Sequence, residues 1–109
     1  MHPAAYGYVI MAADERLYFV AYDISSPKRW RRVFKTMHGY GEHVQLSVFQ
    51  CRLSRMRYVE LVTLLDDLIN HKEDHIVLVD VGLADHVEPK VESLGKHIYT
   101  PVKREPVIV

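Results

Sequence analysis

The sequence predicts one α+β domain with the element order β-α-β-β-α-β. Three observations predict it: apolar runs of strand length, two amphipathic stretches of helix length that each follow a capping serine, and a length of 109 residues that suits one hydrophobic core. The composition, 49% hydrophobic and 26% charged, is typical of a globular protein. We expect the domain to span residues 16–109, after a poorly ordered extension over residues 1–15.

Residues 16–23 predict the first strand, because apolar side chains occupy both of its alternating faces. A strand that is apolar on both faces is usually covered on both sides, which favours a central position in the sheet. Asp23 ends the run, at a kind of position where sheets of α/β type often carry functional groups.

Residues 27–38 predict an amphipathic helix. Ser26 is a suitable N-cap and Pro27 stands at the favoured first position, while Gly39 and Gly41 are expected to end the helix in the left-handed conformation. One stripe at helical spacing is apolar and is expected in the core: Trp30, Val33, Phe34 and Met37.

Residues 43–53 predict two strands joined by a tight reversal. Ser54 then caps a helix over about residues 55–70, and residues 75–81 form a last strand that is again apolar on both faces. The inward face of the second helix is expected to carry Val59, Val62, Leu65, Leu68 and Ile69.

This order of elements is that of the split βαβ, or ferredoxin-like, arrangement. We expect the first and last strands at the centre of the sheet, since both are apolar on two faces. A further strand near the C-terminus then has no free place beside the central strands. We expect it to pair with the sheet edge of a partner protomer and so build a symmetric dimer.

Positive charge is concentrated in the middle of a chain whose net charge is zero. Residues 24–59 contain eight Lys and Arg residues and one acid, a balance of +7, and the remaining residues carry −7. Such segregation gives a local positive patch that can bind phosphates, unless the cations simply lie on solvated faces opposite acids. The cations expected to bind nucleic acid lie on the first helix: Lys28, Arg29, Arg31, Arg32 and Lys35.

The remaining composition excludes several classes of protein. The one cysteine, Cys51, has no partner for an intrachain disulfide and is expected to pack as a small hydrophobe. Apolar runs fall short of the eighteen or so residues of a membrane span, and residues 1–13 lack the Lys and Arg of a signal peptide. We therefore expect a cytoplasmic protein with no membrane partner.

The chemistry of the chain depends on Asp23 and the basic helix that follows it. No nucleotide-binding loop, zinc cluster or nucleophile elbow occurs, and the seven histidines show no close metal-ligand spacing, so none is assigned a role. Mg²⁺ is often held by one or two carboxylates, and a two-fold dimer could place Asp23 beside its symmetry mate. A shared ion would polarise a phosphoryl oxygen and activate a water. Alternatively, Asp23 only caps the following turn.

Four short motifs occur in an order and spacing that resemble the Cas2 family, the small CRISPR-associated protein of the universal adaptation pair. The resemblance covers about residues 16–109. The motifs are Tyr22-Asp23-Ile24-Ser25, Arg31-Arg32-Val33, Gly39-Tyr40-Gly41 and Val44-Gln45-Leu46-Ser47-Val48-Phe49.

The resemblance implies a homodimer whose C-terminal segment, from about residue 95, packs on the partner's sheet. It also implies a Mg²⁺- or Mn²⁺-dependent endonuclease that acts on single-stranded RNA or double-stranded DNA, with Asp23 as the metal ligand. Four further positions match residues associated with activity in the family: Tyr22, Arg32, Ser47 and Phe49.

The sequence is also compatible with other functions. The dimer could be a non-catalytic DNA-binding scaffold that bridges two copies of the CRISPR integrase, a role that needs basic surface but no cleavage. A ribonuclease toxin of the virulence-associated type has a similar fold. A ferredoxin-like small-molecule regulatory domain is disfavoured, because the segregated charge suggests phosphates rather than a ligand pocket.

Overall fold

The structure is a computed structural model that describes residues 14–96 of the chain. Its elements follow the predicted order, and serine side chains cap both helices, Ser26 on the Arg29 amide and Ser54 on the Arg57 amide. The elements are β1 (Arg16–Asp23), α2 (Pro27–His38), β2 (Glu42–Gln45), β3 (Val48–Leu53), α3 (Arg55–Leu68) and β4 (His75–Leu83).

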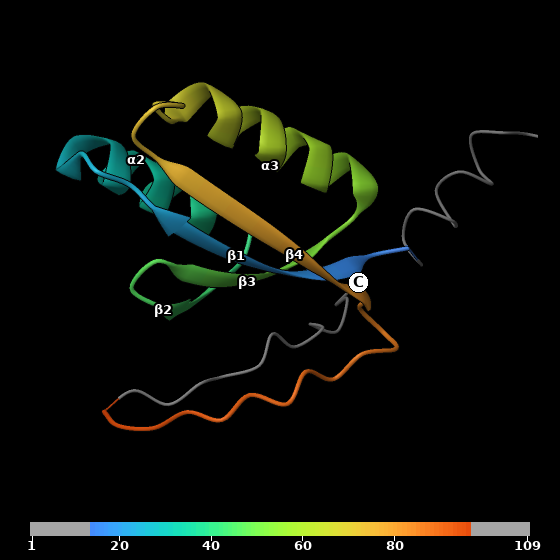
Figure 1. Ribbon diagram of the computed structural model, residues 1–109. Coiled ribbons are helices and arrows are strands. Elements are labelled where there is room, and N and C mark those ends of the chain that lie inside the picture. The colour runs from blue at the N-terminus through green and yellow to red at the C-terminus, as the bar shows by residue number, and fades with distance from the viewer. Residues whose placement is uncertain (1–13, 97–109) are drawn as a thin grey trace, which may run out of the picture.

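The strands form one antiparallel sheet in the order β2-β3-β1-β4, and both helices cover the same face of it (Figure 1). The segment that follows β4 turns back and runs along the opposite side of the sheet (Figure 1). The fold therefore has a helix-covered face and a second face that the chain covers only in part. This is the predicted α+β, ferredoxin-like arrangement.

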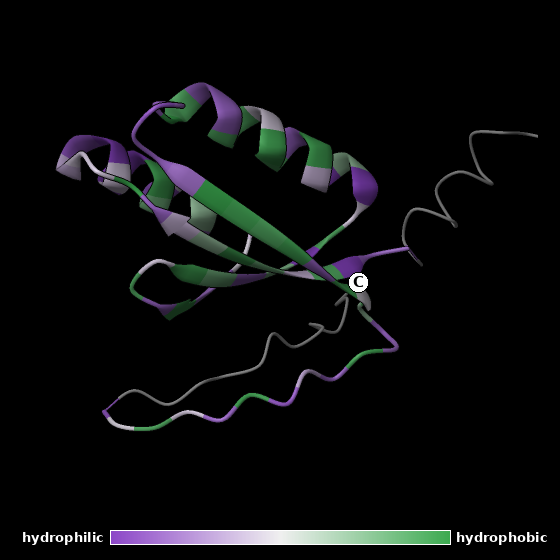
Figure 2. Cartoon of the chain, viewed as in Figure 1, coloured by the Kyte–Doolittle hydropathy of each residue, from purple (hydrophilic) through white to green (hydrophobic). Residues whose placement is uncertain are grey.

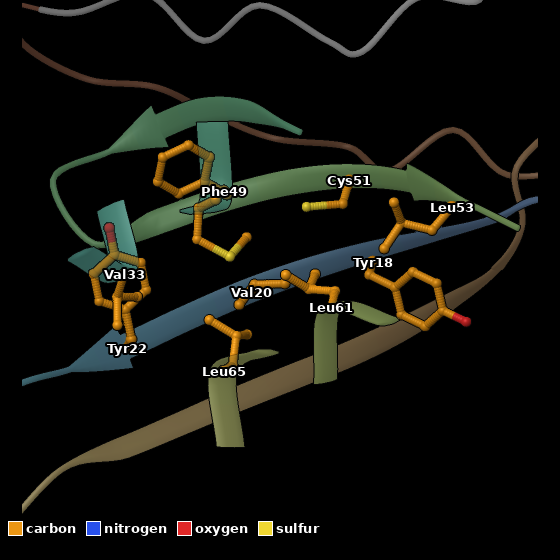
Figure 3. Close-up of a cluster of buried hydrophobic side chains, with 10 residues drawn as sticks. Tyr18, Val20, Tyr22, Val33, Phe49, Cys51, Leu53, Leu61 and Leu65 are labelled. Carbon is orange, nitrogen blue, oxygen red and sulfur yellow. The ribbon is translucent and has the colours of Figure 1, made fainter. Parts of the chain in front are cut away.

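The core lies between the sheet and the two helices (Figure 3). Alternate residues of β1 point into it, and Val20 is fully buried. Figure 3 shows how side chains from β1, β3, α2 and α3 meet in one cluster. Its members are Tyr18, Val20, Tyr22, Val33, Met37, Phe49, Cys51, Leu53, Leu61 and Leu65.

The expectation that the last strand lies at the centre of the sheet was wrong. Among the strands of residues 14–96, β1 and β3 are central, whereas β4 pairs only with β1 and forms an edge. Most of β4 is apolar (Figure 2), but of its apolar side chains only Ile76 and Leu78 pack on the core. On the other face Val77 and Val79 keep 41% and 51% of their surface exposed. The two-sided apolar pattern of β4 thus reflects a face that residues 14–96 leave partly exposed.

Two details of the helices also differ from expectation. Gly39 ends α2 with a φ of −80°, so no left-handed residue is needed there. Gly41 is required for space instead, since a Cβ would lie 2.4 Å from the Cys51 sulfur. In α3 the fully buried side chain is Leu61, whereas Val59, which was expected to face inward, is 52% exposed.

Cys51 is fully buried, as predicted, and burial raises the pKa of its thiol to about 12. Over residues 14–96 no helix has the length and apolar character needed to cross a membrane. The predicted C-terminal strand and most of the predicted N-terminal extension lie outside the described residues, at 97–109 and 1–13.

Candidate metal and nucleic-acid site

Asp23 is the last residue of β1 and is exposed. Its neighbour Tyr22 points into the core, so strand alternation places Asp23 on the face opposite the helices. It is directly paired with His75, the first residue of β4. The predicted metal ligand therefore lies at a corner of the sheet, beside the open edge strand.

The chain after Asp23 is fastened to the turn between α3 and β4. The Ser25 amide donates to Asp74 Oδ1 at 3.0 Å, and the Ser25 hydroxyl donates to the Glu73 carbonyl at 2.8 Å. The Asn70 amide donates to Asp74 Oδ2 at 2.8 Å. Because Asp74 joins both loops, the end of β1 and the start of β4 are held together.

Arg29 completes this arrangement rather than facing solvent as a free cation. Its guanidinium donates to Asp74 Oδ2 at 2.8 Å through Nε and to Glu73 Oε1 at 2.9 Å through Nη2. The Asp74 side chain is fully buried, and the guanidinium hydrogen bond holds the pKa of that carboxyl well below its usual range. We call the group formed by Arg29, Asp74 and Ser25 the loop clamp. Because its guanidinium is paired within this group, Arg29 is not one of the free cations of α2.

The other predicted cations of α2 remain available. Lys28, Arg31, Arg32 and Lys35 are exposed, and none of their side chains has a hydrogen bond or ion pair to another described residue. The first turn of α2 contains no acid. The helix begins four residues after Asp23, so this basic face starts near the carboxylate.

Other arginines of the positive segment are engaged within the chain. Arg52 Nε donates to Glu15 at 2.8 Å, and its terminal nitrogen donates to Asp85. Arg57 donates to Glu60 and to the Gly39 carbonyl, at 2.8 and 2.9 Å. The charge segregation seen in the sequence is therefore partly neutralised in space, and α2 keeps most of the free positive charge.

Tyr22 lies in the core, although it was predicted to act in catalysis. Its side chain is 6% exposed, and its ring lies 6.3 Å from the rings of Trp30 and Phe49, between centroids. Burial raises the pKa of the phenol to about 12. Within residues 14–96 the buried hydroxyl has no hydrogen-bond partner. Tyr22 therefore packs in the core, and its side chain lies on the opposite face of the sheet from the side chain of Asp23.

Ser47 and Phe49, the other two predicted catalytic residues, support the strand that carries Asp23. Ser47 lies in the turn between β2 and β3, where its hydroxyl accepts from Trp30 Nε1 at 3.0 Å. Its carbonyl accepts from the Tyr22 amide at 3.0 Å. Phe49 is fully buried. The structure therefore brings Ser47 and Phe49 to Tyr22, whereas the side chain of Asp23 lies on the opposite face of the sheet.

Asp23 is the candidate ligand for a metal ion at this corner of the sheet, and it is exposed. Over the described residues no group of three or more His, Cys, Asp or Glu side chains could hold an ion. An exposed carboxylate at a strand end suits a hydrated divalent ion that takes its other ligands from water, phosphate or a second protein copy. Asp23 therefore fits Mg²⁺ or Mn²⁺ as a partial site.

The sequence of this chain is similar to those of known proteins. A family model described as "CRISPR associated protein Cas2" matches residues 16–86. The "CRISPR-associated endoribonuclease Cas2" of Geobacter sulfurreducens is 52% identical over 95 residues, 87% of this chain and 99% of the relative. The "CRISPR-associated endoribonuclease Cas2 1" of Rhodospirillum rubrum is also 52% identical over 95 residues, 87% of this chain and 92% of the relative.

Solved structures are similar as well. The crystal structure of Streptococcus pyogenes Cas2 at pH 6.5 aligns with a TM-score of 0.58 at 32% identity, covering 69% of this chain and 99% of that one. A hypothetical protein from Thermus thermophilus aligns with a TM-score of 0.64 at 34% identity, covering 74% and 92%.

Proposed function

Because the chain belongs to the CRISPR-associated Cas2 family, we propose that it is a CRISPR endoribonuclease whose metal ligand is Asp23. The observation that carries this proposal is the position of Asp23: exposed, at a strand end fixed by the loop clamp, and close to the start of a basic helix. The names of the curated relatives favour a nuclease over the scaffold and the toxin. The substrate class is RNA, with double-stranded DNA as the second candidate.

The chain's own residues support this function in three ways. Lys28, Arg31, Arg32 and Lys35 would bind the phosphates of the substrate and guide the strand along α2. The loop clamp fixes the backbone that carries Asp23. A Mg²⁺ or Mn²⁺ ion held by Asp23 would supply polarisation of a phosphoryl oxygen and acidification of a bound water.

A single carboxylate binds a divalent ion only weakly. We therefore propose a homodimer that brings two Asp23 side chains to one ion. The support is the open face of β4, where Val77 and Val79 are exposed beside a strand edge that has no partner strand within residues 14–96. An exposed apolar strand face next to a free edge favours association with a second copy. In the cytoplasm such a dimer would also bind the CRISPR integrase during spacer acquisition.

The test of the proposed activity is Asp23→Asn, which keeps the size of the side chain and removes its charge. We expect the cleavage of labelled single-stranded RNA in Mg²⁺ to fall at least about 100-fold, as for loss of one strong electrostatic group in an active site. RNA affinity measured by fluorescence anisotropy in EDTA should be unchanged or higher. Asp67→Asn, on the exposed side of α3, is the matched control and should cleave at the parental rate.

Labelled double-stranded DNA in the same assay decides which substrate is preferred. Cleavage that continues at the parental rate in purified Asp23→Asn protein would exclude Asp23 as the catalytic ligand and contradict the proposal.

A further inference from the structure

The residue paired with Asp23 across the sheet has a side chain that also binds metal ions. His75 is exposed and stands directly opposite Asp23 in the antiparallel register of β1 and β4. Side chains of directly opposed residues lie on the same face, with their Cβ atoms about 4.5–5.5 Å apart. The carboxylate and the imidazole therefore share one corner of the open face.

The backbone on both sides of this pair is fixed without any ion. Asp74, the residue before His75, accepts the amide of Ser25, the second residue after Asp23, at 3.0 Å. Arg29 and the Asn70 amide bind the other carboxylate oxygen, each at 2.8 Å. The loop clamp thus holds together the two strand ends that carry Asp23 and His75. When the residues that bind an ion are already held in place, less of the binding free energy is lost in ordering them.

A carboxylate and an imidazole together select a different ion from a carboxylate alone. Imidazole nitrogen is a good ligand for first-row transition ions, whereas Mg²⁺ prefers oxygen ligands and keeps its waters. A two-fold dimer would double the set to two carboxylates and two imidazoles. We propose that His75 is a second metal ligand of this site and makes it prefer Mn²⁺ over Mg²⁺. The inference rests on the proposed role of Asp23 as a metal ligand and adds the residue that determines ion selectivity.

The experiment measures binding of Mn²⁺ to the full-length protein without substrate. Electron paramagnetic resonance follows the loss of the free Mn²⁺ signal, and pulsed measurements detect the ¹⁴N modulation of a bound imidazole. In His75→Ala we expect the ¹⁴N modulation to disappear and the Mn²⁺ affinity to fall about tenfold or more, while Mg²⁺ affinity, measured by calorimetry, changes less than about threefold. His75→Asn, which keeps a polar side chain, should behave in the same way and serves if the alanine variant does not fold.

His86→Ala is the matched control, because His86 is an exposed histidine beyond the other end of β4. It should keep both the parental Mn²⁺ affinity and the ¹⁴N modulation. If the modulation persists in folded His75→Ala or His75→Asn protein, or if the Mn²⁺ affinity is unchanged, His75 is not a ligand and the inference is overturned.

The outcomes separate this inference from the proposed nuclease activity. If His75→Ala loses the ¹⁴N modulation but the parent protein cleaves no RNA, the metal site stands and the nuclease proposal fails. If the parent cleaves RNA through Asp23 but His75→Ala binds Mn²⁺ normally, the nuclease proposal stands and the role of His75 fails. If Asp23→Asn also binds Mn²⁺ like the parent, the ion lies elsewhere and both fail.

Discussion

Replacing Tyr22 with phenylalanine should stabilise the protein and leave cleavage unchanged. The Tyr22 side chain is 6% exposed and its hydroxyl has no hydrogen-bond partner within residues 14–96. A buried hydroxyl without a partner costs about 1–3 kcal/mol in proteins. Removal of the oxygen leaves a small void whose cost offsets part of this gain. We therefore expect a net increase of about 1 kcal/mol in the free energy of unfolding.

The assay is thermal denaturation at a fixed protein concentration, since association also contributes to the stability of a dimer. For a domain of this size a gain of about 1 kcal/mol corresponds to a rise in Tm of about 4–8 °C. Tyr22→Ala is the contrasting variant. It removes the ring that packs near Trp30 and Phe49 and should cost about 3–5 kcal/mol, as for other aromatic side chains in protein cores.

RNA cleavage by Tyr22→Phe separates the packing role from a catalytic one. If the hydroxyl took part in the reaction, the folded variant would lose cleavage while keeping its stability. Unchanged cleavage with a raised Tm would confirm that Tyr22 acts only through the core. A fall in Tm of several degrees would refute the reasoning, because it would mean that the hydroxyl has a stabilising partner.

Three further variants test the surface, the loop clamp and the open face. Arg31→Ala with Arg32→Ala should weaken RNA binding and reduce the slope of log affinity against log salt by about 1.4, at about 0.7 for each lost phosphate contact, as measured by anisotropy at several salt concentrations. The fold lowers the pKa of Asp74, so its charge stabilises the fold fully above the unfolded pKa of about 3.9, and this stabilisation is lost as the pH falls below that value. Asp74→Asn should therefore lower Tm at pH 7, and its Tm should fall less than that of the parent protein between pH 5 and pH 3. Val77→Lys puts an unpaired charge on the open face of β4 and should shift sedimentation toward the monomer if this face forms the dimer.

Features that depend on near neighbours were predictable from the sequence. The bounds of β1 and α2 and the capping by Ser26 and Ser54 follow from patterns within a few residues, and the structure confirms them. The exposure of Asp23 at a strand end also follows from the pattern of its own strand.

Features that depend on distant partners were not predictable in this way. Arg29 lies among other basic residues, and its sequence surroundings are typical of a phosphate-binding residue. The carboxylate that binds it, Asp74, is 45 positions away in the sequence, so the local pattern could not reveal the pair. The position of His75 opposite Asp23, from which its proposed role follows, depends on the register between β1 and β4, and no motif reveals it. The periodicity of β4 correctly indicated two apolar faces, but it could not show that residues 14–96 would leave Val77 and Val79 on the second face exposed.

Asp23 and Asp74 differ in what surrounds them, and this difference favours Asp23 over Asp74 as the proposed metal ligand. Asp74 is buried, and its oxygens accept hydrogen bonds from Arg29, Ser25 and an amide of the α3–β4 turn, so its charge is fully compensated. A cation gains little by approaching such a carboxylate. Asp23 is exposed, and its side chain has no hydrogen bond or ion pair to another described residue, so its charge remains free. Since the compensated carboxylate of Asp74 fixes the loop that follows Asp23, stability and the proposed metal binding would depend on separate side chains. Substitutions at Asp74 should therefore change Tm first and ion affinity second, and those at Asp23 should do the reverse.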